Sequence, residues 1–222
     1  MVVSVDLAGW RGPDVDRHLS SGVVAGAVEL CDEYLADLVS VDGEDGAKVS
    51  RFTVGLDMDG VCYDFVGAAA KWSGFKKEDA TGFDIFGSWG APGLWTAFDK
   101  HVQEKGFCLG LDLLPGAQWL VGAIQRVADV LIVTSPYRDA PYWAYEREQA
   151  IRRDFGIERD MVMSVRSKQY ARVDVLIDDK PANIVSFPGN TILVDQPWNQ
   201  SCAAGIRCKT HSDILEVIGN ML

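Results

Sequence analysis

Long apolar runs are missing from this sequence of 222 residues. No segment approaches the ~18–20 consecutive apolar residues that span a bilayer, so we expect no membrane partner. The first residues also lack a basic start followed by an apolar stretch and a small-residue cleavage site, and we therefore expect a cytoplasmic protein. With 48% hydrophobic and 24% charged residues, the composition is typical of a globular protein with one good core.

Paired cysteines and histidine motifs are also missing. The cysteines are odd in number and form no C-x-x-C pair, which argues against a disulfide framework and a zinc site. They are Cys31, Cys62, Cys108, Cys202 and Cys208. We expect free, buried thiols. The three histidines, His18, His101 and His211, lie in no recognised motif, and we expect ordinary structural positions for them.

Basic residues are fewer than acidic ones, and the formal net charge is −11. Binding a nucleic-acid backbone requires a basic surface, so no extended nucleic acid is expected as a partner. The negative charge is uneven, because residues 1–50 hold 10 acidic and 3 basic side chains. A small anionic ligand would therefore need a local positive pocket in an acidic protein.

Residues 1–50 form an N-terminal extension. Apolar residues recur at helical spacing between Val15 and Val41, and the polar segment 42–48 follows as a linker. This pattern predicts an amphipathic helix docked on the core. A partner-binding or oligomerisation element, which leaves a homodimer open, and a mostly disordered tail are the alternatives. We assign no chemistry to the extension.

From Arg51 onward, short apolar runs alternate with helical stretches. This alternation predicts an α/β fold with a Rossmann-like parallel sheet and helices on both faces. The predicted strands are Phe52–Leu56, Val130–Thr134, Met161–Val165, Val173–Ile177 and Thr191–Val194. The predicted helices are Gly116–Ala128, Pro141–Phe155 and Ser212–Leu222, the last with Ser212 as its N-cap. Residues 51–64 and 115–222 would form this core.

Residues 65–114 interrupt the alternation and are rich in glycine and aromatic side chains. They lie between the first predicted strand and the next clear βα unit. This position predicts a small, mainly helical cap inserted after the first motif strand and over an active site. An ordinary aromatic cluster in the core is the alternative.

Two carboxylates, Asp57 and Asp59, follow the first predicted strand and precede Gly60. Ligands of open parallel sheets bind at the carboxyl ends of the strands, and i, i+2 spacing allows both side chains to face one pocket. Carboxylates this close repel each other unless a cation or a proton is present. The motif therefore favours a divalent ion such as Mg²⁺, although a capped turn would leave the same pattern.

Three further segments carry polar groups in the same arrangement. Asp178 and Asp179 end another predicted strand, and their adjacency strengthens the metal hypothesis. Thr134 and Ser135 end a third strand, where hydroxyls either bind phosphate oxygens or form a turn. Lys168 lies ten residues before Asp178 and would balance the negative charge, unless it is a solvated surface lysine.

In this order the four segments resemble the haloacid dehalogenase superfamily of phosphatases. The resemblance implies that Asp57 is the nucleophile, that Asp59 is first general acid and then general base, and that Thr134 and Lys168 stabilise the phosphate and the nucleophile. It also implies a Mg²⁺ ion held by Asp57, by the main-chain carbonyl of Asp59 and by an acid from the pair Asp178/Asp179, with Asp179 preferred.

Several stretches from about Arg51 to the C-terminus are similar to the 5'(3')-deoxyribonucleotidases. They are Asp57–Phe65, Phe107–Ala117, Thr134–Pro136, Arg166–Lys168, Leu176–Pro181 and, for bacterial and phage-type relatives, Asp195–Asn199. This similarity implies that Phe65 stacks on a base and that Ser135, Arg166 and Gly60 belong to the substrate-binding set.

We therefore expect a Mg²⁺-dependent enzyme that dephosphorylates nucleoside monophosphates, deoxyribonucleotides above all, through an aspartyl-phosphate. Two alternatives stay open. One is an enzyme of the same fold that acts on another small phosphate or a nucleic-acid end, and the other is a non-catalytic binding protein.

Overall fold

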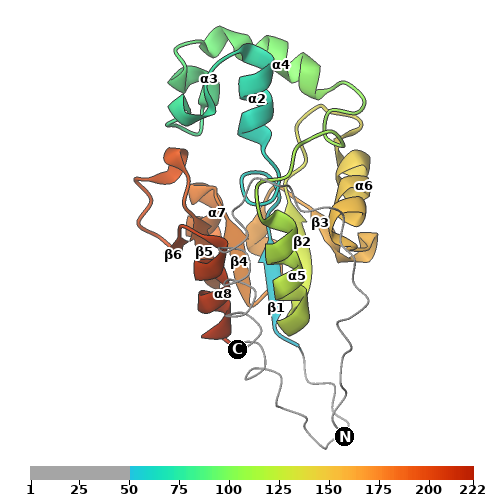
Figure 1. The fold of residues 1–222 in the computed structure, drawn as a ribbon, viewed down its shortest axis with the longest axis vertical. Coiled ribbons are helices and arrows are strands. Elements are labelled where there is room, and N and C mark those ends of the chain that lie inside the picture. Colours follow the sequence, from blue (N-terminus) through green and yellow to red (C-terminus); the bar gives the residue numbers. More distant parts are fainter. Residues whose placement is uncertain (1–50) are drawn as a thin grey trace, which may run out of the picture. The chain divides into compact units, whose positions relative to one another are not determined.

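A six-stranded parallel sheet forms the centre of the structure, a computed structural model that describes residues 51–222 (Figure 1). The strands are β1 (Thr53–Leu56), β2 (Asp129–Thr134), β3 (Val162–Ser164), β4 (Val175–Asp178), β5 (Asn190–Val194) and β6 (Ile206–Cys208). Their order is β3-β2-β1-β4-β5-β6, and every neighbouring pair is parallel. The predicted α/β fold is thus confirmed, whereas the expectations for residues 1–50 lie outside the described residues.

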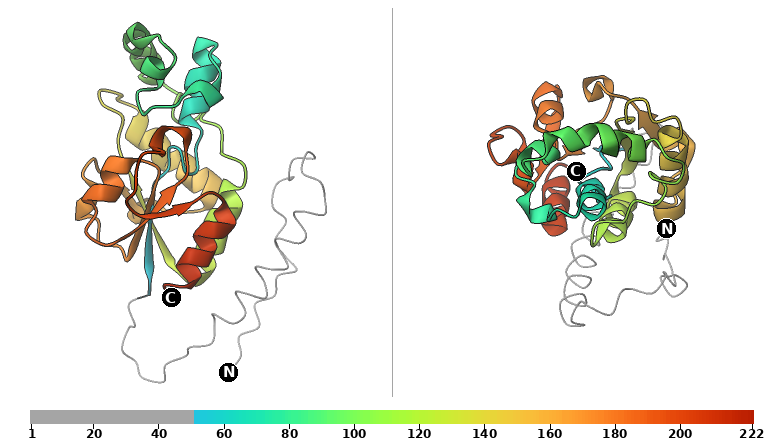
Figure 2. Two further views of the ribbon diagram at one scale, coloured as in Figure 1. Left: turned by 90° about the vertical axis from the view of Figure 1, so that its left-hand side faces the viewer. Right: turned by 90° about the horizontal axis from the view of Figure 1, so that it is seen from above.

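Helices cover both faces of this sheet. They are α5 (Ala117–Val127), α6 (Trp143–Phe155), α7 (Pro181–Ser186) and α8 (His211–Gly219). Helix α5 packs against β2, α6 and α8, while α7 packs against β4 and β5. Figure 2 shows α5 and α8 on one side of the sheet and α7 on the other. All four residues of β4 are consequently buried. No helix of residues 51–222 has the length and apolarity that a membrane crossing would require.

The five predicted strands and three predicted helices are present, with ends shifted by one or two residues in most cases. Strand β6 and helix α7 were not predicted. Strand β6 has Arg207 between its two apolar residues and so forms no apolar run, and α7 has only six residues, too few for a clear helical periodicity. The prediction of Ser212 as an N-cap is wrong. Thr210 caps α8 instead, because its hydroxyl accepts from the Asp213 amide while the Asp213 carboxylate accepts from the Thr210 amide.

The segment after β1 forms three helices, which lie beyond the carboxyl ends of the strands (Figure 1). They are α2 (Phe65–Ser73), α3 (Ile85–Ser88) and α4 (Trp95–Val102), joined by the 3₁₀ turns η2 (Lys77–Asp79) and η3 (Pro92–Leu94). Phe86 and Phe98 are fully buried and touch each other edge to face. Aromatic rings therefore build the interior of this helical layer. Residues 65–114 as a separate cap domain stay a prediction.

The predicted free thiols are present wherever the structure describes a cysteine. Cys62, Cys108 and Cys208 are buried and Cys202 is half-buried, all four without a disulfide partner. Burial raises the pKa of the Cys62 and Cys208 thiols, so neither is an activated nucleophile.

Candidate functional site

The carboxyl ends of the central strands open into a cavity of about 520 Å³, which helices α2, α3 and α4 border on the other side. Of the predicted site residues, those that line it are Asp57, Asp59, Gly60, Phe65, Ser135, Arg166 and Asp179. Those that lie behind its wall, fully buried, are Thr134, Lys168 and Asp178. The sheet thus gathers all the predicted site residues at one edge, as expected for strand ends in a parallel sheet.

Lys168 lies at the centre of the charged groups. Its Nζ is 2.7 Å from Asp57 Oδ1 and 2.6 Å from Asp178 Oδ2, and its side chain has no exposed surface. Burial alone lowers the pKa of this ammonium, but the two carboxylates outweigh burial and raise it. Lys168 is therefore a permanent cation, not the solvated lysine of the alternative interpretation.

The two adjacent acids of β4 have different partners. Both oxygens of Asp178 accept hydrogen bonds from the protein, Oδ1 from the Lys180 amide and Oδ2 from Lys168 and Asn183. Burial, followed by the charge of Asp57, raises the pKa of Asp178 to about 6. Asp179 accepts one side-chain hydrogen bond within residues 51–222, from the Trp198 indole to Oδ2 at 2.8 Å. Burial and the nearby carboxylates raise its pKa well above the ordinary value.

Asp57, Asp178 and Asp179 each offer an oxygen within 4.8 Å of the others, and all three side chains are buried. One lysine cannot neutralise three carboxylates, so a net negative charge is left beside Lys168. A hard divalent cation that prefers carboxylate oxygens fits this donor set. The predicted Mg²⁺ ion is therefore compatible with the residues present. Burial first, and then the charge of the neighbouring carboxylates, raises the pKa of both Asp178 and Asp179, so a bound cation would offset part of this effect.

Asp59 is held by an arginine that sequence reasoning missed. Arg147 Nη2 lies 2.5 Å from Asp59 Oδ1, and the Arg147 side chain is 1% exposed. Its guanidinium also lies over the rings of Tyr63 and Trp143, 4.6 and 5.0 Å from their centroids. Burial raises the pKa of Asp59, whereas Arg147 lowers it. Helical spacing alone places Arg147 on the same face of α6 as the buried Trp143 and Ile151, unlike the exposed Arg152 and Arg153, and this signal could have identified it as an inward-facing arginine.

Gly60 permits the turn that follows the two acids. Its φ is +81°, a conformation that side chains rarely adopt, and a Cβ atom at this position would lie 2.3 Å from Asp179 Oδ2. Gly60 therefore brings the β1 loop directly against the second acid of β4. It lines the cavity by main-chain atoms alone.

The predicted phosphate-binding groups lie at the end of β2, where Thr134 is the last residue, and on the loops that follow β2 and β3. Thr134 Oγ1 is buried and finds no hydrogen-bond partner among the described residues. Ser135 Oγ donates to the Val165 carbonyl at 3.3 Å and lines the cavity together with Arg166. Phe65 also lines the cavity, but its ring packs edge to face against Phe98, so part of its surface belongs to the aromatic interior.

Comparisons with known proteins identify one matching family. The family described as "5' nucleotidase, deoxy (Pyrimidine), cytosolic type C protein" matches residues 51–221. Similar solved structures include haloacid dehalogenase-like hydrolases from Burkholderia xenovorans (14% identity, 78% of this chain and 99% of that chain, TM-score 0.49) and Streptococcus pneumoniae (13%, 76% and 99%, 0.48). At such identities the likeness concerns the fold alone. No curated protein matches the sequence significantly.

Proposed function

The chain belongs to the family of deoxy (pyrimidine), cytosolic type C 5' nucleotidases. From this premise we propose that it is a Mg²⁺-dependent phosphatase of the haloacid dehalogenase type that acts on nucleoside monophosphates, deoxyribonucleotides above all. The observation that carries the proposal is the group of three buried carboxylates around Lys168 at the edge of the sheet. Such a group suits phosphoryl transfer, which needs positioning and charge neutralisation more than covalent power.

Asp57 is the proposed nucleophile. Lys168 fixes one of its oxygens at 2.7 Å, so the second oxygen is left to attack phosphorus and form an aspartyl-phosphate. Asp59 would donate a proton to the departing sugar oxygen and then remove one from the water that hydrolyses the aspartyl-phosphate. Arg147 keeps the Asp59 carboxylate in place from outside the cavity. Thr134, whose hydroxyl has no partner in residues 51–222, is available for a phosphoryl oxygen.

Asp57, Asp179 and the main-chain carbonyl of Asp59 are the proposed Mg²⁺ ligands. Asp179 is favoured over Asp178 because both Asp178 oxygens already accept hydrogen bonds from Lys168, Asn183 and Lys180. When bound, Mg²⁺ supplies positive charge that offsets the carboxylates and the substrate phosphate.

Aromatic and basic side chains of the cavity support a nucleotide as substrate. Flat rings line it from both layers, and they are Phe65, Phe83, Trp95, Tyr137, Trp143 and Trp198. Such rings stack on a nucleobase more readily than on a sugar alone. Arg138, Arg166 and Lys180 line the same cavity and provide the local positive charge that an acidic protein needs for an anionic ligand.

The direct test of the nucleophile is Asp57→Asn. This variant is expected to abolish phosphate release from a nucleoside monophosphate, because an amide cannot form the aspartyl-phosphate, while the circular dichroism spectrum stays that of the wild type. Asp160→Asn, a change at an exposed carboxylate outside the cavity, is the matched control and should keep full activity. Full activity of Asp57→Asn would overturn the assignment.

A further inference from the structure

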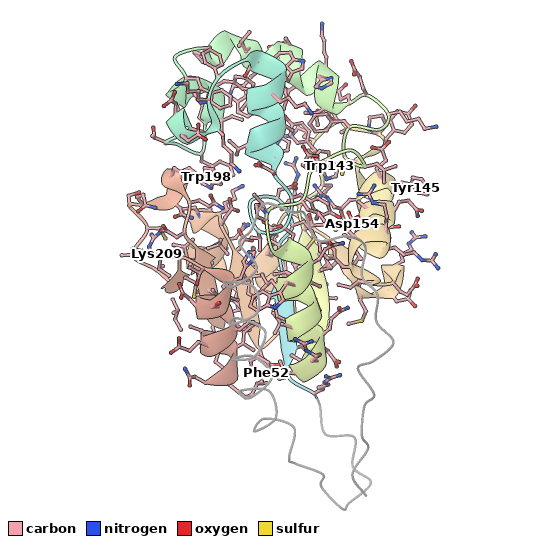
Figure 3. The ribbon with its side chains drawn as sticks, in the orientation of Figure 1. Phe52, Trp143, Tyr145, Asp154, Trp198 and Lys209 are labelled. Atoms are coloured by element: carbon pink, nitrogen blue, oxygen red, sulfur yellow. The ribbon has the colours of Figure 1, made fainter. Side chains whose placement is uncertain are left out.

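The segment Asp195–Asn199, which follows the carboxyl end of β5, reaches both loops that carry the proposed metal ligands. It includes the 3₁₀ turn η6 (Pro197–Asn199). Figure 3 shows Trp198 at the level where the strands end, below the helical layer. Three of its side chains donate hydrogen bonds to the β1 and β4 loops, and none of the three takes part in a chemical step of the proposed reaction.

Trp198 and Asn199 hold the Asp179 residue at two places. The Trp198 indole donates to Asp179 Oδ2 at 2.8 Å, and Asn199 Nδ2 donates to the Asp179 main-chain carbonyl at 2.8 Å. Asn199 has no exposed surface, and its amide also donates to the Val194 carbonyl. The carboxylate and its main chain are thus fixed independently.

Gln196 holds the facing loop. Its Nε2 donates to the Gly60 carbonyl at 2.7 Å. Gly60 in turn lies so close to Asp179 Oδ2 that a Cβ atom would clash with it. One oxygen of Asp179 is therefore enclosed between the Trp198 indole and the Gly60 main chain, and the other has no donor within the described residues.

The segment itself is anchored by hydrogen bonds within it and from β6. Gln196 and Asn199 close a capping box around η6. Arg207 on β6 donates to Asp195 Oδ1, to Asn199 Oδ1 and to the main-chain carbonyls of Asn199 and Cys202. A segment anchored at this many points can hold a neighbouring side chain in one rotamer.

We propose that Trp198 and Gln196 are positioning residues that hold the Asp179 carboxylate with a single oxygen free and so set the affinity and the selectivity of the metal site. This inference rests on the proposed function, because it takes Asp179 as a metal ligand. Hydrogen bonds to ligating carboxylates orient them, and their loss weakens metal binding about 10- to 100-fold. Mg²⁺ demands near-ideal octahedral geometry, whereas Ca²⁺ accepts carboxylates that bind through both oxygens. Restricting Asp179 to one oxygen therefore favours Mg²⁺ over Ca²⁺.

The experiment is a calorimetric titration of the metal-free, full-length protein with MgCl₂ and with CaCl₂, in the absence of substrate. The variant is Trp198→Phe, which keeps a ring but removes the indole N–H. Trp119→Phe on α5, outside the cavity, is the matched control. Asp179→Asn is the reference for loss of the proposed ligand.

We expect Trp198→Phe to raise the Kd for Mg²⁺ about tenfold or more and the Kd for Ca²⁺ by less, so that the preference for Mg²⁺ falls. Trp119→Phe should bind like the wild type. A general loosening of the fold would weaken both ions alike and would not change their ratio. The Gln196→Met variant should shift the Kd for Mg²⁺ and the Kd for Ca²⁺ in the same direction as Trp198→Phe. If Trp198→Phe does not fold, Gln196→Met is the variant that tests the proposal.

The outcomes separate the two claims. A wild-type protein that binds no Mg²⁺, or an Asp179→Asn variant that binds it normally, would overturn the proposed metal site and the inference with it. The inference alone would be overturned by a different set of results. In that set the wild type binds Mg²⁺, Asp179→Asn does not bind it, and the tested positioning variant binds it with an unchanged Kd. An equal weakening of both ions would also overturn the claim about selectivity.

Discussion

At the scale of single residues, Lys168 compensates the charge of the site. Its buried ammonium pairs with Asp57, which lines the cavity, and with the fully buried Asp178. Removing one partner of a buried ion pair leaves the other charges without compensation, which typically costs about 3–5 kcal/mol. Lys168 therefore has a structural effect as well as its proposed catalytic one.

Lys168→Met is expected to abolish phosphate release and to lower the free energy of unfolding by about 3–5 kcal/mol, because two buried carboxylates lose their cation. Urea unfolding with EDTA present measures the second effect. Lys209→Met, at an exposed position outside the cavity, is the control and should change neither quantity. A stable and active Lys168→Met protein would contradict this account.

Asp179→Asn is expected to stabilise the metal-free protein at pH 7.5. A carboxyl whose pKa is raised by folding contributes stability at low pH and loses it as the pH rises from about 3.8 toward the raised pKa. The amide does not ionise, so the advantage of the variant should grow with pH above about 4. Thermal unfolding in EDTA at pH 4 to 7.5 measures it.

Mg²⁺ should reverse the order of stability of these two proteins. At a concentration of 100 times its Kd the ion would stabilise the wild type by about 2.7 kcal/mol, and it would not stabilise the variant. If Asp179→Asn is less stable than the wild type in EDTA at pH 7.5, the ionised Asp179 carboxylate does not destabilise the metal-free protein, and the prediction is wrong.

The sequence predicted the proposed catalytic and metal-binding residues better than the residues that hold them in place. Asp57, Asp59 and Asp179 follow strands, and the carboxyl ends of parallel strands meet, so their proximity was predictable. Arg147 and Trp198 were not predicted to act on the site. The spacing of Arg147 with Trp143 and Ile151 places it on the buried face of α6, but the group that it contacts there depends on how α6 packs. The contact of Trp198 likewise depends on how η6 packs, which the local sequence does not show.

At the scale of elements, α2 and α8 each begin with a side-chain N-cap, but only α2 borders the cavity. Asp64 caps α2, where its carboxylate accepts from the Gly67 amide, and it also pairs with Lys77 at 2.7 Å. Thr210 caps α8 with a hydrogen bond to the Asp213 amide. Helix α2 carries Phe65 into the cavity, whereas no residue of α8 lines it.

Asp64→Ala and Thr210→Ala should each lower the free energy of unfolding by about 1 kcal/mol, because each removes an N-cap. Only Asp64→Ala should also raise KM for a nucleotide, since it loosens the start of the helix that presents Phe65. Unfolding curves and steady-state kinetics measure the two effects. Equal KM values for both variants would contradict a role of α2 in substrate binding.

Length alone did not decide which elements were predictable, because three-residue β3 lies in an apolar run and was predicted whereas three-residue β6 was not. Four-residue β1 was found because its apolar run ends in two acids, while three-residue β6 had no such mark. The start of α8 was misplaced by one residue, because the serine at position 212 resembles an N-cap but the threonine two residues earlier forms the complete capping box.

At the scale of the whole molecule, an acidic chain encloses a cavity with basic side chains at its edge. The sequence indicated that an anion would need a local positive pocket, and Arg138, Arg166 and Lys180 line the cavity. The aromatic pattern did not reveal which rings face the ligand. Phe83 and Trp95 line the cavity, whereas Phe86 is fully buried, a difference that depends on the packing of α3 and α4.

The central claim is best tested by inorganic phosphate release from a panel of ribo- and deoxyribonucleoside monophosphates with Mg²⁺, beside an EDTA control and a set of sugar phosphates. The account predicts strong, EDTA-sensitive release from a subset of nucleotides, deoxyribonucleotides first, and little from sugar phosphates. Release from no nucleotide, or release that EDTA leaves unchanged, would contradict it.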